Sequence, residues 1–242
     1  MKTAFITGSA RGIGKAIAKR LSADGFKVIL HGARESDHIK ALKLEIEQGG
    51  GVAEIATADL CDLNAVKALS KTAANADVLV LNASVQYRTP WQEITTDACL
   101  AQLHCNFVSS MLLMQATVPH MQSAGWGRII TIGSVQEAKP HPDMLVYAAS
   151  KAAQTNMMQS LALQLAKSGI TVNNIAPGVI NTDRNREALS DPAYAKKVID
   201  GIPLGFYGKP EDCAGIVSLL CSEEGRYITG QSIYVDGGKS IQ

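Results

Sequence analysis

The chain has 242 residues, of which 46% are hydrophobic and 19% are charged. This composition excludes an intrinsically disordered protein, because it supplies enough apolar side chains for a packed core. The 23 basic and 22 acidic residues nearly cancel, so no nucleic-acid partner is expected. The chain opens without a signal-peptide pattern and its apolar runs are too short for a membrane span, which predicts a cytoplasmic protein. The five scattered cysteines lack metal-ligand spacing, and no metal is expected.

Short β-branched runs alternate with longer helical patterns along the chain. Strands are expected at residues 3–7, 27–31, 53–57, 78–81, 128–132, 171–175 and 232–235. Helices are expected at residues 14–23, 37–48, 63–73, 97–122, 144–167 and 210–222. The central strands are apolar on both faces, as a parallel sheet covered by helices on both sides requires. The pattern therefore predicts one α/β domain over residues 1–242, built on a doubly wound, parallel, seven-stranded sheet.

Two of the expected helices, 97–122 and 144–167, carry apolar residues nearly all round. A helix that covers one face of a sheet normally keeps a polar stripe toward water. Their outer faces therefore predict contact with a second copy of the chain, in a symmetric homodimer or homotetramer.

A glycine-rich segment follows the first expected strand and leads into the first helix. It reads Thr7-Gly8-Ser9-Ala10-Arg11-Gly12-Ile13-Gly14. Gly8 permits a tight turn, Gly12 allows the backbone to approach a pyrophosphate, and Gly14 allows the helix to pack closely. Free N–H groups at the start of the helix would then face the phosphates of a dinucleotide. A glycine turn of this kind also occurs where a helix simply begins, so its position after the first strand is what favours a binding site.

The end of the second strand predicts which nicotinamide dinucleotide binds. A carboxylate there would hold the ribose hydroxyls of NAD and repel a 2′-phosphate. The sequence instead reads His31-Gly32-Ala33-Arg34, with no acidic residue before Glu35. Arg34, together with Arg11, could pair with that phosphate, whereas the alternative is an ordinary solvated surface charge. We therefore expect NADP, with NAD as the second choice.

Tyr147 and Lys151 are four residues apart on an expected helix, so their side chains share one face. A phenol has a pKa near ~10, and its use as a base at neutral pH requires a depression worth about 4 kcal/mol. An ammonium group ~4 Å away, at an effective dielectric constant near ~20, supplies about that much. The two side chains are therefore candidates for acid–base chemistry at a carbonyl or alcohol, although the same spacing is common in helices with a structural role.

Ser134 and Asn106 are polar residues in otherwise apolar surroundings. Ser134 follows the buried strand 128–132, at the sheet edge where ligands bind, and its hydroxyl can polarise a substrate carbonyl. Asn106 lies in an apolar helical stretch, where an amide is costly unless it is hydrogen-bonded. Each residue alone could also be a hydrogen-bonded polar group with a purely structural role. The evidence for catalysis comes from their combination with Tyr147 and Lys151.

Taken in order, these motifs resemble the short-chain dehydrogenase/reductase family over essentially the whole chain. The motifs are Thr7-Gly8-x3-Gly12-Ile13-Gly14, Asp59-Leu60, Asn82-Ala83, Asn106, Ser134, Tyr147-x3-Lys151, Pro177-Gly178-x3-Thr182 and Val235-Asp236-Gly237-Gly238. The resemblance implies a Rossmann fold, hydride transfer between NAD(P) and a carbonyl or alcohol, and commonly a tetramer. It also implies a catalytic tetrad of Asn106, Ser134, Tyr147 and Lys151.

The resemblance further implies the residues that hold the cofactor. Asp59 with Leu60 would contact adenine, Lys151 the nicotinamide ribose, and residues 177–182 the carboxamide. The full expected set is Gly8, Ser9, Arg11, Gly12, Ile13, Gly14, Arg34, Asp59, Leu60, Asn82, Ala83, Ser84, Tyr147, Lys151, Pro177, Gly178, Val179, Ile180 and Thr182. One stretch departs from the family pattern: the expected Asn-Asn-Ala-Gly reads Leu81-Asn82-Ala83-Ser84, so a polar group is lost at Leu81 and a Cβ is added at Ser84.

Substrate selection is expected in the loops beyond the strand ends. The candidates, beside Ser134 and Tyr147, are Gln86, Tyr87, Arg88, Gln136, Glu137 and His141. Residues 183–206, which include Arg184, Asn185, Arg186 and Tyr194, are expected to form a lid. These polar loops favour a sugar, polyol or keto acid. A reductase of 3-oxoacyl groups on acyl carrier protein is the alternative, and a catalytically silent NADP-binding regulator is an alternative of another class.

Overall fold

A computed structural model describes residues 1–242, apart from the side chains of residues 187 and 188. The sheet contains seven strands in the order β3-β2-β1-β4-β5-β6-β7, and every neighbouring pair is parallel. The strands are β1 (Thr3–Ile6), β2 (Lys27–Gly32), β3 (Ala53–Thr57), β4 (Val78–Leu81), β5 (Gly127–Ile132), β6 (Ile170–Pro177) and β7 (Ser232–Val235). The predicted doubly wound, parallel, seven-stranded sheet is confirmed, with each strand within two residues of its expected limits.

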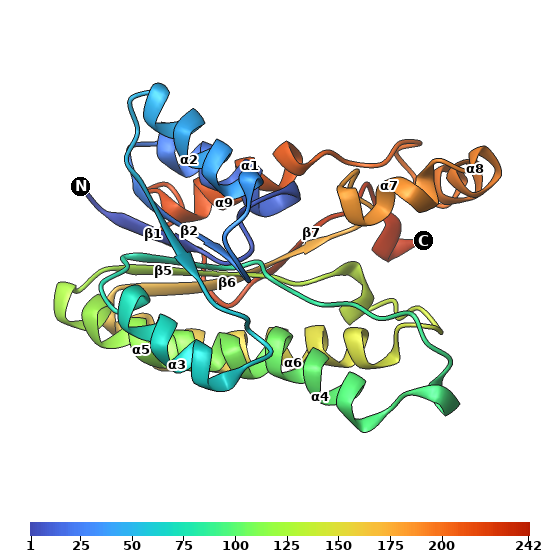
Figure 1. The fold of residues 1–242 in the computed structure, drawn as a ribbon, viewed down its shortest axis with the longest axis horizontal. Coiled ribbons are helices and arrows are strands. Elements are labelled where there is room, and N and C mark those ends of the chain that lie inside the picture. The colour runs from blue at the N-terminus through green and yellow to red at the C-terminus, as the bar shows by residue number, and fades with distance from the viewer.

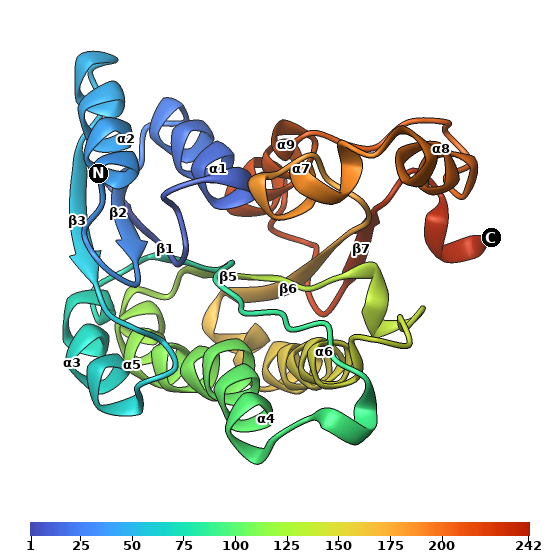
Figure 2. The same cartoon turned by 45° about the vertical axis from the view of Figure 1, so that its right-hand side comes forward.

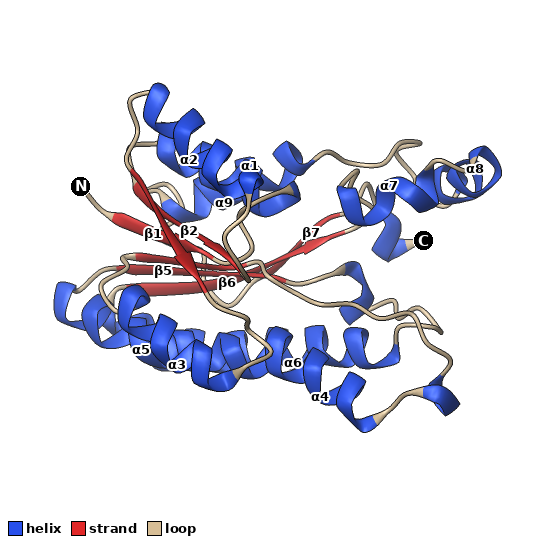
Figure 3. Ribbon diagram, viewed as in Figure 1, coloured by secondary structure: helices blue, strands red, loops and turns tan.

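Helices cover both faces of the sheet (Figures 1 and 3). One layer contains α1 (Gly12–Ala23), α2 (Asp37–Gln48) and α9 (Pro210–Cys221). The other contains α3 (Leu63–Ala73), α4 (Thr96–Leu103), α5 (Ser109–Ala124) and α6 (Leu145–Leu165). Short helical turns occupy η1 (Trp91–Glu93), η3 (Val135–Glu137), η4 (Ala166–Ser168) and η5 (Lys239–Ile241).

The alternation of side chains along the strands divides the core into two clusters. In β1, Ala4 and Ile6 face the cluster beneath α1, α2 and α9, whereas Phe5 faces the cluster beneath α3, α5 and α6. Val80 and Leu81 of β4 divide in the same way. Because both faces are buried, the strands need apolar residues at every position, which explains the continuous apolar runs in the sequence.

The expected helix 97–122 is divided by a π-helical segment, η2 (His104–Val108), between α4 and α5. Thr95 begins α4, with its hydroxyl accepting a hydrogen bond from the N–H of Ala98 at 3.2 Å. Gly125, at a φ of +62°, ends α5 in the left-handed conformation. A single π turn inside a helix often marks a functional position, and the buried residue at the centre of this one is Asn106.

Residues 183–206, the expected lid, fold largely into two short helices, α7 (Asp183–Leu189) and α8 (Pro192–Asp200). Figure 2 shows them beyond the ends of β6 and β7. The Asp191 side chain caps α8 by accepting from the N–H of Ala193 at 3.0 Å, and Ile202 is buried. Whether the segment opens and closes as a lid stays a prediction.

Several large apolar side chains remain on the surface of the layer that contains α6. Leu145 and Leu163 of α6 are 52% and 85% exposed, and Leu100 of α4 is also exposed. Within residues 1–242 as described, no helix combines the length and apolar character that a membrane span requires.

Candidate active site

All seven strands run in the same direction, so their carboxyl ends meet at one edge of the sheet. The connections after β1 and β4, which are neighbours, lead to helices on opposite faces, and such a switch point opens a crevice. The predicted site residues that directly follow strands lie on this edge: Gly8 to Gly14 after β1, Arg34 after β2, Asp59 and Leu60 after β3, Asn82 to Ser84 after β4, Ser134 after β5, and Gly178 to Thr182 after β6.

Thr7 and Asn82 fix the glycine turn to the end of β4. The Thr7 hydroxyl accepts hydrogen bonds from the N–H groups of Asn82 and Ala83 at 2.9 and 3.0 Å. In return, the Asn82 amide donates to the carbonyls of Thr7 and Gly8 at 2.9 and 3.0 Å. The turn is thus held rigidly between β1 and β4, on the crevice.

The glycines of the turn leave no room for side chains. Gly8 and Gly12 have φ angles of +64° and +57°, which favour glycine. A Cβ at Gly14 would collide with the Gly8 carbonyl oxygen and lie 2.5 Å from the Asn82 amide nitrogen. A Cβ at Gly12 would lie 3.3 Å from the Thr182 methyl group, so the turn faces the segment that follows β6. This open backbone cradle is what a pyrophosphate needs.

Ser9, Arg11 and Ile13 have different surroundings within the turn. Ser9 is buried, and its hydroxyl accepts from the N–H of His31 at 2.9 Å. Ile13 is half-buried against the core, whereas Arg11 is exposed at the start of α1. Of these three predicted cofactor residues, Arg11 has a side chain free to meet a ligand.

His31, at the end of β2, holds the glycine turn from the other side. Its Nδ1 accepts from the N–H of Gly8 at 3.2 Å, and its Nε2 lies 3.1 Å from the carbonyl oxygen of Ala58. These partners assign the neutral tautomer with the proton on Nε2. Burial lowers the pKa of His31 to about 4, although the hydrogen bond with Ala58 acts in the other direction. The turn is therefore built around an uncharged histidine.

The ends of β2 and β3 present one basic and one acidic side chain. Arg34 is exposed, and the neighbouring Glu35 carboxylate forms an ion pair with Lys40 at 3.1 Å. Asp59 is exposed beyond β3, whereas Leu60 is buried in the core. The side chain of Leu60 thus packs in the core, and its predicted place in the cofactor site stays a prediction.

The segment after β6, residues 177–182, is fixed by its backbone. The N–H of Gly178 donates to the carbonyl of Val235 at 3.0 Å, and the N–H of Gly208 donates to that of Val179 at 2.9 Å. Ile180 is buried. Thr182 directly precedes α7 and faces the glycine turn, so the two predicted cofactor segments lie on opposite sides of the crevice.

Tyr147 and Lys151 are both buried on α6, on the face turned toward the sheet. The Lys151 ammonium group donates to the carbonyl of Ile132 at 2.6 Å and to the Gln154 side chain at 3.3 Å. Burial, followed by the charge of Arg184, lowers the pKa of Lys151 to about 8. The group thus stays mostly protonated at neutral pH.

The electrostatics of Tyr147 differ from the sequence expectation. Burial raises the pKa of the Tyr147 hydroxyl, and the opposing influences are the charge of Arg184 and hydrogen bonds with the side chains of Ser134, Ser84 and Arg184. Lys151 was expected to lower this pKa, but its ammonium group lies 5.9 Å from the centre of the Tyr147 ring and is directed to Ile132.

Asn106 connects α6 to the loop that follows β4. Its amide nitrogen donates to the carbonyl of Val85 and to the Ser150 hydroxyl, both at 3.0 Å, and its side-chain oxygen accepts from the N–H of Val85 at 2.9 Å. The Asn106 carbonyl accepts from the Ser110 hydroxyl at 3.2 Å, and that hydroxyl accepts from Gln154 at 2.9 Å. A hydrogen-bonded chain therefore runs from Asn106 to the partner of Lys151.

Ser134 and Gln136 belong to the turn between β5 and α6. The Ser134 hydroxyl accepts from the N–H of Gln136 at 3.2 Å, which starts η3. The Gln136 side-chain oxygen is buried and has no hydrogen-bond partner among the described atoms, so it is available to a donor. Glu137, by contrast, accepts from Thr155 at 2.8 Å and from Ser232 at 2.5 Å, so it ties elements together instead of facing the crevice.

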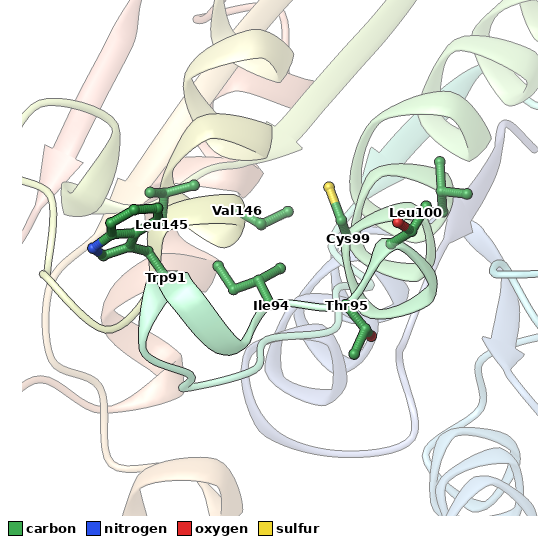
Figure 4. A pocket seen from close by; sticks show the side chains of 8 residues that line it. Trp91, Ile94, Thr95, Cys99, Leu100, Leu145 and Val146 are labelled. Atoms are coloured by element: carbon green, nitrogen blue, oxygen red, sulfur yellow. The ribbon is translucent and has the colours of Figure 1, made fainter.

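Two hollows lie beside α6 rather than around Tyr147. One, of about 510 Å³, is lined by Gln136, Glu137, Pro140, His141, Pro142, Leu145, Ala148, Ala149 and Ala152. The predicted substrate residue His141 is therefore in a hollow whose lining includes neither Ser134 nor Tyr147. The other, of about 350 Å³, is an apolar groove between η1, α4 and the start of α6, where the Trp91 ring lies near Leu145 (Figure 4). Gln86, also predicted, lies in the loop after β4.

The chain resembles known proteins along nearly its whole length. A family model described as Enoyl-(Acyl carrier protein) reductase matches residues 8–240. The dehydrogenase/reductase SDR family member 4 of Bos taurus is 34% identical, over 98% of this chain and 86% of its own length. The chain belongs to the short-chain dehydrogenase/reductase family.

Two solved structures share the fold closely. A 3-oxoacyl-(acyl-carrier-protein) reductase from Agrobacterium tumefaciens, with NADP bound, has a TM-score of 0.93 and 36% identity, covering 98% of this chain and 93% of that one. A gluconate 5-dehydrogenase from Burkholderia cenocepacia, in complex with NADP and tartrate, has a TM-score of 0.93 and 30% identity, covering 100% and 96%.

The two departures from the short-chain dehydrogenase/reductase pattern have different structural reasons. Leu81 is buried in the core with Phe5 and Leu79, so its side chain replaces a polar group with packing. Ser84 faces the crevice mouth, where its hydroxyl and carbonyl accept hydrogen bonds from Arg184.

Sequence reasoning missed the structural roles of Thr7 and His31 and the position of Arg184. A polar residue at the end of a buried strand must find partners, and that signal was available for Thr7 and His31. Arg184 is 100 residues from Ser84 in the chain, and no local pattern could have joined them.

The neutral state of His31 predicts a loss of stability in acid. The pKa of His31 is about 4 in the folded protein, below its ordinary value of 6.5. The free energy of unfolding is therefore unaffected by protonation of His31 above pH 6.5 and decreases as the pH falls from 6.5 toward 4, because only the unfolded chain takes up the proton. The expected loss is on the order of 3 kcal/mol. Urea titrations of the wild type and His31→Gln between pH 7 and 4 measure it, and the variant should show the shallower pH dependence. The exposed His38→Gln is the control and should follow the wild type; equal slopes for wild type and His31→Gln would contradict the neutral assignment.

Proposed function

We propose that this protein transfers a hydride between NADP(H) and the carbonyl or secondary alcohol of a small polar substrate. The observation that supports the proposal is a set of contacts at one sheet edge. Lys151 bonds the Ile132 carbonyl at the end of β5, and Asn106 bonds Val85 in the loop after β4. The same loop begins at Asn82, which holds the glycine turn. A structural role for Tyr147 and Lys151 alone would not require the cradle.

The glycine turn suits a dinucleotide because Gly8 and Gly12 have positive φ angles and carry no side chain over the backbone, and because Gly14 lets α1 pack closely against Gly8 and Asn82. Gly8, Gly12 and the N–H groups at the start of α1 would hold the pyrophosphate. Asp59 would bind adenine, Lys151 the nicotinamide ribose, and residues 177–182 the carboxamide. When bound, the nicotinamide supplies or accepts the hydride.

The end of β2 supports NADP over NAD. A dehydrogenase that uses NAD needs a free carboxylate there for the ribose hydroxyls, and the nearest one, Glu35, is paired with Lys40. Arg34 is exposed beside it and can pair with a 2′-phosphate. The related 3-oxoacyl reductase and gluconate 5-dehydrogenase structures both hold NADP, which agrees with this choice.

In the reducing direction, Tyr147 would give its phenolic proton to the substrate oxygen while Ser134 donates a hydrogen bond to the same oxygen. The raised pKa of Tyr147 keeps the hydroxyl protonated before reaction, as an acid requires. In the oxidising direction, Tyr147 would act as the base, and positive charge near its oxygen would assist.

Lys151 and Asn106 would help to position Tyr147 and to restore its proton. The protonated Lys151 lies at the end of the chain through Gln154 and Ser110 to the Asn106 carbonyl. After each turnover the Lys151 ammonium group would return a proton to Tyr147 through solvent water and regain one from solvent, while the hydrogen bonds to Gln154, Ser110 and Asn106 would hold these groups in place. Asn106 also holds Ser150 and the loop after β4 at fixed distances, so Tyr147 keeps its position.

The substrate class is proposed from the polar loops beyond the strand ends, although Gln136 lines the hollow of His141, whose lining includes neither Ser134 nor Tyr147. The gluconate 5-dehydrogenase with tartrate binds a polar, hydroxylated acid, which supports the sugar, polyol or keto-acid class. The likeness to a 3-oxoacyl-(acyl-carrier-protein) reductase makes that activity the second candidate.

Replacing Tyr147 by Phe tests the catalytic proposal. Turnover of NADPH with a panel of sugars, keto acids and 3-oxoacyl thioesters should fall by roughly 10²- to 10⁴-fold, because the proton donor is lost. NADPH affinity, measured by cofactor fluorescence, should stay within about twofold, since the hydroxyl faces the substrate side. Tyr227→Phe, which removes the same hydroxyl group from a tyrosine that is 99% exposed, is the control. Unchanged turnover in Tyr147→Phe would refute its role, and NADPH binding without any wild-type turnover would favour the silent regulator.

Replacing Arg34 by Ala tests the cofactor choice. Loss of a charge-assisted contact with the 2′-phosphate should weaken NADPH binding by roughly 10- to 100-fold and change NADH binding little. Fluorescence titrations with both dinucleotides measure the two affinities. The exposed Arg20→Ala on α1 should leave both unchanged, and a wild-type preference for NADH would overturn the assignment.

We also propose that copies of the chain associate through residues 97–122 and 144–167 as a homodimer or homotetramer, because Leu100 of α4 and Leu145 and Leu163 of α6 are exposed. Leu163→Glu should reduce the mass found by sedimentation velocity. Leu44→Glu places the same charge on α2, in the opposite helical layer, and should not. A monomeric wild type would contradict the proposal.

A further inference from the structure

Arg184 reaches across the mouth of the crevice. It lies near the start of α7, and its guanidinium group donates to the Ser84 carbonyl at 2.8 Å and to the Ser84 hydroxyl at 3.2 and 3.3 Å. Ser84 belongs to the loop after β4. The contact therefore joins the two sides of the crevice, directly at the site.

The charge of the same guanidinium group acts on the candidate catalytic hydroxyl. Burial raises the pKa of Tyr147, and the charge of Arg184 opposes that rise. The charge of Arg184 also acts on Lys151, whose pKa it helps to lower. Arg184 is thus a cation of the site itself, whereas an ordinary surface arginine would be directed to solvent.

Ser84 explains how this cation is held. The family pattern has a glycine at this position, which has no hydroxyl to accept from an arginine. Here the serine supplies the second acceptor for Arg184. The departure from the pattern and the arginine therefore act together, as one feature of this chain.

We propose that Arg184 and Ser84 form a receptor for a carboxylate beside the Tyr147 hydroxyl, so that the substrate is a small oxo acid or the matching hydroxy acid. This inference rests on the proposed function. A guanidinium group presents paired N–H donors that match a carboxylate, and a serine hydroxyl can donate a further hydrogen bond to it.

The geometry limits the distance between the carboxylate and the reacting carbonyl. Leu81 of β4 pairs with Thr131 of the neighbouring strand β5, so Ser84 and Ser134 each lie three residues beyond a paired position, and Arg184 is bonded to Ser84. The carbonyl oxygen would lie against Ser134 and Tyr147 and the carboxylate against Arg184, which suits a 2-oxo or 3-oxo acid. In the reaction the carbonyl carbon gains the hydride and its oxygen gains the Tyr147 proton, and the carboxylate is unchanged.

Two matched pairs of compounds test the receptor: pyruvate with hydroxyacetone, and acetoacetate with 4-hydroxy-2-butanone. Each pair keeps the ketone and replaces the carboxylate by a neutral hydroxymethyl group. The wild type should prefer the acid of at least one pair by about 10-fold or more in kcat/KM. Arg184→Gln should lower kcat/KM for that acid by at least about 10-fold more than for its neutral partner, because any effect of the lost charge on Tyr147 and Lys151 is common to both compounds.

Further variants separate the receptor from other roles of Arg184. Ser84→Gly, which restores the family residue, should raise KM for the acid alone. Arg226→Gln, which removes an equal charge after α9, should change nothing. NADPH affinity of Arg184→Gln should match the wild type. Equal losses on acid and neutral ketone, a loss of NADPH binding, or a wild type that prefers the neutral ketones would each overturn the receptor.

Failure of the proposed function gives a different result. If none of the four compounds is reduced, hydride transfer to small ketones is refuted, and the receptor is then tested by binding. Saturation-transfer NMR with pyruvate and hydroxyacetone in the presence of NADP⁺ should show pyruvate binding that Arg184→Gln loses. Equal pyruvate signals from the wild type and Arg184→Gln would overturn the receptor as well.

Discussion

The parallel direction of all seven strands is the constraint on which the site depends. It brings seven carboxyl ends to one edge, so residues as far apart as Gly8, Ser134 and Thr182 meet around one crevice. A parallel sheet must also be covered on both faces, and that covering makes the interior dry. In a dry interior, each polar side chain at the edge needs a partner, and the network around the site follows from that need.

The cofactor side of the crevice is held by neutral hydrogen bonds. Thr7 and Asn82 tie the glycine turn to β4, and uncharged His31 ties it to β2 and to the Ala58 carbonyl. No charge is required to shape the cradle, so its N–H groups remain available for phosphates. A protonated His31 would have to donate at Nδ1, where the Gly8 N–H already donates.

The substrate side is governed by charge in a buried setting. Burial alone raises the pKa of Tyr147 and lowers that of Lys151, and both shifts favour the uncharged forms. Arg184 acts on both groups, because its positive charge stabilises a phenolate and disfavours a second cation. The lysine is held by its hydrogen bonds to the Ile132 carbonyl and the Gln154 side chain.

The sequence by itself determined the seven strands and most helix limits, because two-sided burial leaves local patterns, whereas the tetrad stays a prediction that rests on the family resemblance. It did not reveal the π segment at Asn106, the orientation of Lys151 or the contact between Arg184 and Ser84. Each of these depends on which distant elements pack together: β5 offers a carbonyl to Lys151, and α7 carries Arg184 over the loop after β4. The periodicity of apolar residues along the sequence indicates whether a side chain is buried. Only the tertiary structure decides which residue that side chain contacts.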